Sequence, residues 1–259
     1  MKVILPYRSE FGFNCMVHAP QANAVRGPKV ICLEPGMEAL YPGAVRYWQV
    51  YHRHDVERRV FLEEQLLAET EAILRKEYPD AEFIRPDHKA TRRYFVPRPT
   101  VRKGIECDVV VCPRARDYGS SKNLQAWPAI IDALKNQHGL RVFAGGAPDS
   151  SDTSIECDAA WKYTRHLDAT IEAMASAKLV VATDNGLAHL AMMVGTPLLL
   201  ISYKDGIVAP GADDMGKPYW PIKIERFYEA NHCRVNIEIL KDSWDKPAMV
   251  ALRAAELIE

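Results

Sequence analysis

The sequence predicts an α/β protein of two lobes, each built around a parallel β-sheet with helices packed on it. The length of 259 residues exceeds what one ordinary core needs and is enough for two compact lobes. Apolar residues make up 48% and charged residues 26%, which is the ordinary globular range. In the second half, short apolar strands alternate with helical segments. That alternation is typical of β-α-β units in a doubly wound sheet.

The first lobe is expected to span residues 1–103. An apolar run at 2–5, ended by Pro6, predicts the first strand. The other expected segments are a helix near 14–25, strands at 30–33 and 46–51, and a helix over 61–78. The last helix is the clearest, because apolar residues recur in it at helical spacing. A segment with three prolines, 85–103, is expected to be a partly extended linker.

The second lobe is expected to span residues 104–245 and to be followed by a closing helix within 246–259. Strands are predicted at 109–112, 140–144, 179–182 and 198–201. Helices are predicted at 127–137, around 168–174 and at 187–194. Pro128 falls in the first turn of its helix, where proline is tolerated. Asp168 is expected to be the N-cap of its helix.

Composition excludes several classes of protein. No stretch approaches the roughly 18 to 20 continuous apolar residues of a membrane helix, so no membrane span is expected. The apolar start is too short for a signal peptide. Six cysteines are scattered without a C-x-x-C pair, which favours reduced packing residues. We therefore expect a soluble, cytoplasmic protein.

Charge is unevenly distributed although the net charge is only -1. Residues 1–103 hold 17 Lys and Arg against 13 Asp and Glu, whereas the remainder holds 16 against 21. An anionic macromolecule would therefore approach the first lobe.

The most informative segment runs from a buried strand through Asp184-Asn185-Gly186 directly into a helix. In an open parallel sheet such a turn lies at the carboxyl edge, where ligands bind. The first N–H groups of a helix lack intrahelical partners and suit a pyrophosphate. Gly186 would allow close approach, and His189 could donate to a phosphate oxygen. The alternative is an Asx-type turn that only caps the helix, with His189 packed in the core.

The same segment, 183–191 followed by Gly195-Thr196-Pro197, resembles the D-[ST]-G-x-x-H-L-A-x-A-x-G-x-P signature of glycosyltransferase family 9, the heptosyltransferases. Asn185 stands where that family usually has Ser or Thr, and Met193 where it often has Ala.

Two further motifs within residues 107–202 resemble the same family. Residues 113–116 with Lys122 and Trp127 are similar to its strand, polar loop and Lys-x-Trp-Pro helix start, with extra residues between Lys122 and Trp127. Residues 145–149 are similar to its G-G-x-x-E turn beside the nucleotide ribose, with Asp149 in place of Glu. The resemblance implies a GT-B-like fold of two Rossmann-type lobes with a shortened N-terminal lobe. It also implies transfer of a sugar from a nucleotide-diphosphate sugar.

Physical role and resemblance together give the expected donor-binding residues: Arg114, Arg116, Lys122, Asp149, Asp184, Asn185, Gly186, Leu187 and His189. Cations and a helix terminus would stabilise the leaving diphosphate, and the chain has no Asp-x-Asp motif. We therefore expect no metal and no cofactor. The alternative for the arginines is a solvated loop charge.

An inverting transfer needs a group that takes the proton of the acceptor hydroxyl. The resemblance implies an aspartate after the first strand, but here no aspartate follows Gly12. Glu10 is the only carboxylate in this loop, and we expect it to be the base. Pairing of Glu10 with Arg8 is the alternative, and His18 is the reserve candidate.

The acceptor is expected to contact a basic, aromatic segment that includes Arg92, Arg93 and Tyr94. Cations and aromatic rings suit a nucleic acid or another polyanion, although a solvated charged face explains them equally. Transfer to a hydroxylated base in DNA is therefore one alternative function. A sugar-nucleotide epimerase or hydrolase is another, and so is a nucleotide-sugar-binding protein that has lost its base.

Overall fold

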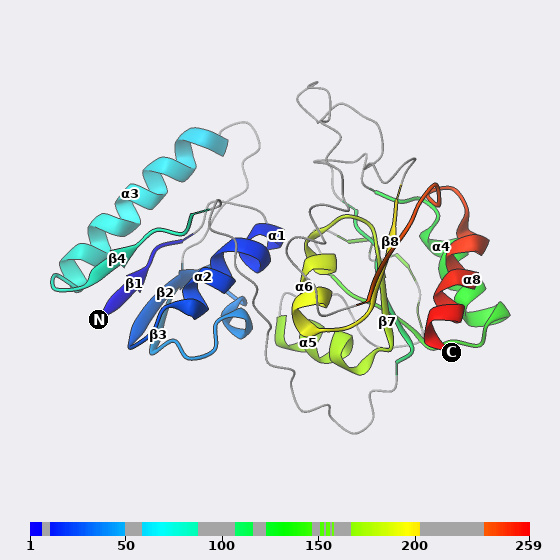
Figure 1. The fold of residues 1–259 in the computed structure, drawn as a ribbon. Coiled ribbons are helices and arrows are strands. Elements are labelled where there is room, and N and C mark those ends of the chain that lie inside the picture. The colour runs from blue at the N-terminus through cyan, green and yellow to red at the C-terminus, as the bar shows by residue number, and fades with distance from the viewer. Residues whose placement is uncertain are drawn as a thin grey trace. The chain divides into compact units, whose positions relative to one another are not determined.

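The computed structural model describes residues 1–6, 11–49, 59–87, 107–115, 123–146, 151–152, 154–155, 157, 167–202 and 236–259. The chain divides into two compact units, residues 1–96 and 97–259. Each unit contains its own sheet of parallel strands (Figure 1). Within the described ranges, no helix is long and apolar enough to cross a membrane.

The N-terminal unit is built on a four-stranded sheet in the order β3-β2-β1-β4, with every pair parallel. Its strands are β1 (Lys2–Ile4), β2 (Lys29–Leu33), β3 (Arg46–Gln49) and β4 (Glu82–Ile84). Its helical segments are α1 (Phe11–Phe13), the π-helical η1 (Asn14–His18), α2 (Ala19–Ala24), the 3-10 turn η2 (Glu38–Leu40) and α3 (Arg59–Glu77).

Packing in this unit places α3 against the sheet. Leu74 of α3 is fully buried and contacts a cluster formed by Val3, Leu5, Val30 and Cys32. Because β1 and β2 lie in the middle of the sheet, their side chains are covered by neighbours, which explains why both strands read as apolar runs. Strands are added to the sheet on both sides of β1, with β2 and β3 on one side and β4 on the other.

The C-terminal unit has a five-stranded sheet in the order β6-β5-β7-β8-β9, again with every pair parallel. Its strands are β5 (Val109–Cys112), β6 (Val142–Ala144), β7 (Leu179–Ala182), β8 (Leu198–Ile201) and β9 (Ile237–Leu240). Its helices are α4 (Trp127–Asp132), which continues as the π-helical η5 (Ala133–Gln137), α5 (Leu167–Ser176), α6 (Gly186–Val194) and α8 (Pro247–Ile258).

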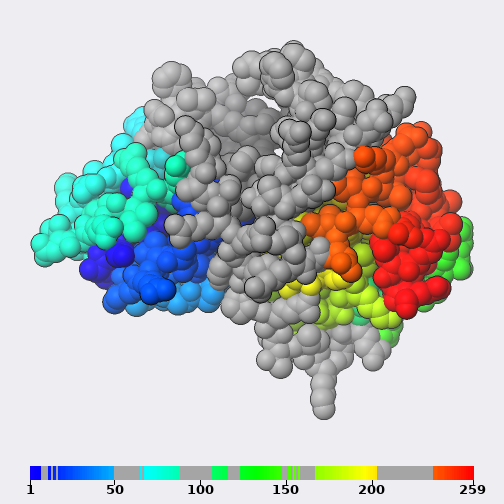
Figure 2. Space-filling view, viewed as in Figure 1, coloured from blue at the N-terminus to red at the C-terminus, as the bar shows by residue number. Residues whose placement is uncertain are grey.

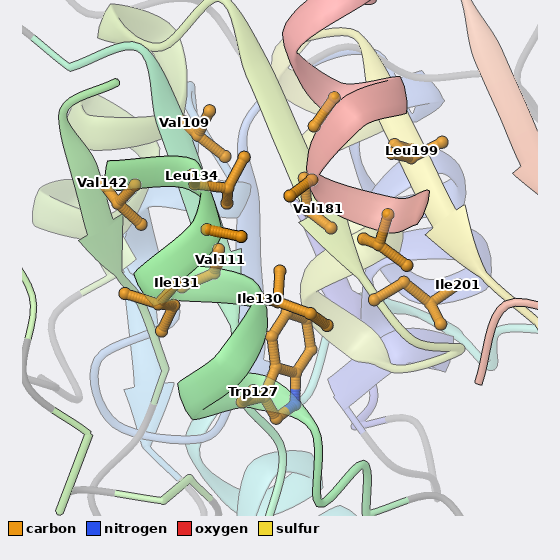
Figure 3. Close-up of a cluster of buried hydrophobic side chains, with 14 of the residues drawn as sticks. Val109, Val111, Trp127, Ile130, Ile131, Leu134, Val142, Val181, Leu199 and Ile201 are labelled. Atoms are coloured by element: carbon orange, nitrogen blue, oxygen red, sulfur yellow. The ribbon is translucent and has the colours of Figure 1, made fainter. Parts of the chain in front are cut away.

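Helices cover both faces of this sheet, with α4 and α8 on one face and α5 and α6 on the other (Figure 1). The central strands β5, β7 and β8 are buried at every position. Trp127 extends from the start of α4 into the core on the α4 side, beside Ile130 and Val181 (Figure 3). At 1% exposed it is the largest fully buried side chain of the described residues.

Helix α8 packs beside α4 on one face of the C-terminal sheet. Val250, Ala251 and Ala254 face the core, whereas Leu252 is 51% exposed. The space-filling view shows α8, in red, at the surface of the C-terminal unit (Figure 2). This amphipathic arrangement explains why the helix could be anticipated from its sequence.

Most expected elements are confirmed, with three differences. The first helical run begins at Phe11, before the expected position. Asp168 lies inside the first turn of α5, which begins at Leu167, so the expectation that it is the N-cap is wrong. Strands β4 and β9 were not expected. The expected linker falls mostly outside the described residues.

Candidate functional site

The carboxyl ends of β6, β5 and β7 lie side by side at one edge of the C-terminal sheet. From β5 the chain moves to one side to form β6 and then returns to form β7 on the other side. The sheet therefore has its topological switch point between β5 and β7. Ligands of open parallel sheets bind outside the carboxyl ends of the strands at such a point. The three motifs singled out in the sequence follow these three strands.

The start of α6 is organised by the side chain of Asn185. This residue is extended (φ -152°, ψ 172°) and forms the N-cap of the helix. Its Oδ1 accepts hydrogen bonds from the backbone N–H of Leu187 at 2.9 Å and of Ala188 at 3.1 Å. At the other end, Gly195 terminates the helix in the left-handed conformation (φ 81°) that glycine adopts without strain.

This cap changes which donors the helix can offer. The sequence suggested that the first N–H groups would all be open to an anion, but two of them already bind Asn185. The N–H of Gly186 is the one in this turn with no hydrogen-bond partner among the described residues. The helix therefore offers one backbone donor at its positive end. The capping turn, which was the alternative interpretation of this motif, is present.

His189 lies one turn into α6 and is 3% exposed. Its neighbours along the helix, from Ala188 to Val194, are buried as well. The burial agrees with a packing role for the ring, and the hydrogen bond from His189 to a phosphate oxygen stays a prediction. Asp184 precedes the cap and is half-buried.

The turn after β6 reaches the start of α6. Gly146 has φ +152°, a conformation that side chains rarely adopt. A Cβ placed on it would lie 1.9 Å from Ser151 Oγ and 3.6 Å from Leu187 Cδ1. The N–H of Gly145 binds the carbonyl of Val111 at 2.9 Å, which fixes the turn against β5. The absence of a side chain at Gly146 thus makes room where the turn, Ser151 and the start of α6 meet.

Arg114 lies two residues beyond the end of β5 and is half-buried. Its Nη1 donates to Asn123 Oδ1 at 2.5 Å. Its backbone forms an isolated antiparallel bridge with Ser151, and Asp152 N donates to the carbonyl of Pro113 at 2.9 Å. The guanidinium is therefore oriented by a neighbour at the same sheet edge. Asn123 and Ser151 were not anticipated from the sequence, because neither belongs to a recognisable motif.

Several expected site residues lie outside the described residues and remain predictions. They are Glu10, Arg92, Arg93, Tyr94, Arg116, Lys122 and Asp149. Of the expected donor-binding residues, the structure brings together Arg114 and the Asp184–Leu187 turn at one sheet edge.

The reserve candidate for the base, His18, is buried at 1% exposure in the N-terminal unit. Its Nε2 lies 3.0 Å from the carbonyl of Leu5, and its Nδ1 lies 2.5 Å from the hydroxyl of Tyr41. Since a carbonyl can only accept, Nε2 donates and Nδ1 accepts. Both nitrogens are occupied, so His18 has a structural role and is not placed to take a proton from an acceptor.

Solved structures with a similar fold include heptosyltransferases. The E. coli heptosyltransferase WaaC with ADP has a TM-score of 0.57 and 14% identity, covering 99% of this chain and 100% of that one. The E. coli ADP-heptose lps heptosyltransferase II has a TM-score of 0.53 and 14% identity, and the match covers 100% of this chain and 98% of that one. The dodecameric iron-containing heptosyltransferase TibC, in complex with ADP-D-beta-D-heptose, has a TM-score of 0.52 and 11% identity. The match covers 100% of this chain and 77% of that one. These likenesses show a shared fold.

No match was found among curated proteins. The model of glycosyltransferase family 9 (heptosyltransferase) matches residues 44–202 of the sequence, which include the three motifs at the carboxyl edge of the C-terminal sheet. Since this match covers more than half of the chain, the protein belongs to glycosyltransferase family 9 and is a glycosyltransferase.

Proposed function

We propose that this glycosyltransferase takes a sugar from an ADP-linked, heptose-type donor and transfers it to an acceptor hydroxyl. The main support is the meeting of Arg114, the Gly145–Gly146 turn and the start of α6 at a topological switch point. The choice of ADP rests on similar structures, which contain ADP, ADP-2-deoxy-2-fluoro heptose or ADP-D-beta-D-heptose.

The donor diphosphate would lie outside the carboxyl ends of β5 and β7. The Gly186 N–H and the positive end of α6 would face one phosphate. The guanidinium of Arg114, which donates to Asn123 at the same sheet edge, would supply positive charge to the diphosphate. Lys122 and Arg116 are proposed from the sequence to add positive charge. Gly146 leaves room for the Ser151 hydroxyl close to Leu187.

The transfer is proposed to be a direct displacement. The acceptor oxygen forms a bond to the anomeric carbon while the bond from that carbon to the diphosphate oxygen breaks. Attack from the opposite side inverts the configuration of the anomeric carbon. The proton of the acceptor hydroxyl goes to Glu10, and the negative charge leaves on the nucleoside diphosphate. Cations and the helix terminus stabilise that charge, so we propose that no metal is required.

The donor proposal is tested by thermal shift with UDP, ADP, GDP, CDP and TDP in the absence of metal. A ligand at one hundred times its dissociation constant should raise the free energy of unfolding by about 2.7 kcal/mol. We expect ADP to give the largest shift in the wild type and little shift in Arg114→Gln.

Lys178→Gln is the matched control for this experiment. Lys178 precedes β7 at the opposite, amino edge of the same sheet, where it pairs with Asp108 at 2.9 Å. This variant should keep the shift. Absence of a shift with every diphosphate would contradict the proposed donor site, and equal loss in both variants would show a general charge effect.

The base and the acceptor need separate measurements. Glu10→Gln should leave ADP binding intact and strongly reduce turnover, whereas near-normal turnover would rule Glu10 out.

If the acceptor is a nucleic acid, DNA binding should weaken steeply as salt rises. Salt-insensitive or absent binding would favour a glycan or another small acceptor.

A further inference from the structure

Ser151 lies where the three segments of the candidate site meet. Its backbone is bridged to Arg114, and the next residue, Asp152, donates from its N–H to the carbonyl of Pro113 at 2.9 Å. These two contacts fix Ser151 against the residues that follow β5. Its position therefore depends on the sheet edge itself, although it is distant from β5 in the sequence.

The side chain of Ser151 points toward the turn after β6. Its Oγ lies 1.9 Å from the position that a Cβ on Gly146 would occupy. The same position is 3.6 Å from Leu187 Cδ1, in the first turn of α6. The hydroxyl thus occupies the space that the missing side chain of Gly146 leaves, next to the start of the helix.

Among the residues that the structure describes, no hydrogen bond involves the hydroxyl of Ser151, and the side chain is half-buried. Ser154, three residues later, differs, because its hydroxyl donates to the carboxylate of Asp152 at 2.5 Å. A hydroxyl can donate one hydrogen bond and accept two. At this edge it stands with two other donors, the Arg114 guanidinium and the Gly186 N–H. Several donors at one sheet edge suit the oxygens of an anion.

We propose that Ser151 is a donor-binding residue whose hydroxyl donates a hydrogen bond to the diphosphate of the nucleotide sugar. This inference rests on the proposed function, since it assigns a further contact to the same site. The diphosphate is favoured over the ribose because Ser151 is paired directly with Arg114 and approaches the positive end of α6. Both neighbours attract negative charge.

The test compares ADP and adenosine binding by calorimetry in wild type, Ser151→Ala and Ser154→Ala. Loss of a hydrogen bond to a charged group should raise the dissociation constant for ADP about tenfold in Ser151→Ala. Ser154→Ala should bind ADP as the wild type does. Adenosine binding should be unchanged in both variants, because adenosine carries no phosphate. An equal loss of adenosine and ADP binding in Ser151→Ala would overturn the diphosphate assignment in favour of the ribose.

Thermal unfolding without nucleotide separates binding from structure. A purely structural Ser151 would lower the melting temperature of Ser151→Ala while leaving its affinity for ADP unchanged, and that result would overturn the inference. If the wild type binds ADP and Ser151→Ala binds it equally well, only the role of Ser151 is refuted. If the wild type binds no nucleoside diphosphate, the proposed donor site fails and the role of Ser151 fails with it.

Discussion

At the residue scale, His18 shows how burial and hydrogen bonding fix a protonation state. The ring is enclosed beside the carboxyl end of β1, between the carbonyl of Leu5 and the hydroxyl of Tyr41. Burial lowers the pKa of His18 to about 4, because the charged imidazolium loses its hydration. The hydrogen bond to Leu5 raises the pKa but only partly offsets this effect. The ring is therefore neutral in the folded protein at ordinary pH.

This lowered pKa predicts a loss of stability in mild acid. The unfolded chain binds a proton at His18 near pH 6.5, whereas the folded chain binds it only near pH 4. Between these values the unfolded state holds more protons, so the free energy of unfolding falls as pH falls, by up to about 1.4 kcal/mol per pH unit. His18→Gln, which can keep both hydrogen bonds, should lose that part of the slope.

Denaturation midpoints measured from pH 8 to pH 4.5 check this expectation. Above about pH 7 the curves of wild type and His18→Gln should run parallel, because His18 is neutral in both states there. Below about pH 6.5 the wild type should fall more steeply. Identical slopes through the acid range would show that His18 titrates normally in the folded state.

Some residues of the candidate site could be predicted from the sequence and others could not. Asp184 to Leu187 could be predicted as a turn and helix start, because the strand, the Asx residue and Gly186 are adjacent in the chain. Asn123 and Ser151 could not, because their contacts with Arg114 form only in the folded chain. Arg114 meets Ser151 only after β5 and β6 have paired. A lone serine in a polar loop carries no pattern that indicates this.

At the element scale, the turn after β6 is expected to tolerate no side chain at Gly146. In Gly146→Ala the new Cβ would collide with Ser151 Oγ and would also be strained at φ +152°. Ser151 would have to move, which would disturb its bridge to Arg114. We therefore expect weaker ADP binding, by about tenfold or more, if one charged hydrogen bond is lost.

Gly139→Ala is the matched control for the turn, because Gly139 also has positive φ (+65°) but no atom within 4 Å of its added Cβ. This variant should lose some stability from backbone strain and keep its affinity for ADP. Calorimetric titration of both variants distinguishes the two effects. Equal affinity in Gly146→Ala and wild type would mean that the nucleotide does not depend on this turn.

The N-cap of α6 gives a second prediction for an element. Asn185→Ala removes the acceptor of the Leu187 and Ala188 N–H groups and should lower the free energy of unfolding by about 1 kcal/mol. Asn185→Ser, which restores a capping oxygen, should recover most of this loss. Urea denaturation of the three proteins measures the difference. An Ala variant as stable as the wild type would show that solvent satisfies these N–H groups at no cost.

The central strands of the C-terminal sheet were the easiest to predict. Strands β5, β7 and β8 are buried on both faces, and such strands read as continuous apolar runs. Strands β4 and β9 lie at sheet edges and are half-exposed along their length. Neither has an apolar run that differs from its surroundings, so their pairing is set by the neighbouring strand and not by local pattern.

At the scale of the whole molecule, the two-sheet architecture could be predicted because each β-α-β unit repeats the same local signal. The position of the candidate site followed from that architecture, since the switch point of a parallel sheet can be deduced once strand order is known. Strand order itself was not deduced from the sequence. The acceptor side is the least predictable part, because its expected residues belong to no motif recognised in the sequence.

Metal dependence is a property of the complete enzyme and gives the last prediction. The proposed donor site would offer a guanidinium, a helix terminus and a backbone N–H to the diphosphate, and Lys122 and Arg116 are expected from the sequence to add charge. These groups can neutralise the leaving group without a divalent ion. We therefore expect initial rates with an ADP-linked donor to be unchanged in excess chelator.

The comparison is informative because TibC, which has a similar fold, is iron-containing. Rates should be measured with chelator alone and after adding magnesium, manganese or ferrous iron in excess. Activity that is lost in chelator and restored by one of these ions would refute metal-independent transfer while leaving the family assignment intact, since that rests on residues 44–202.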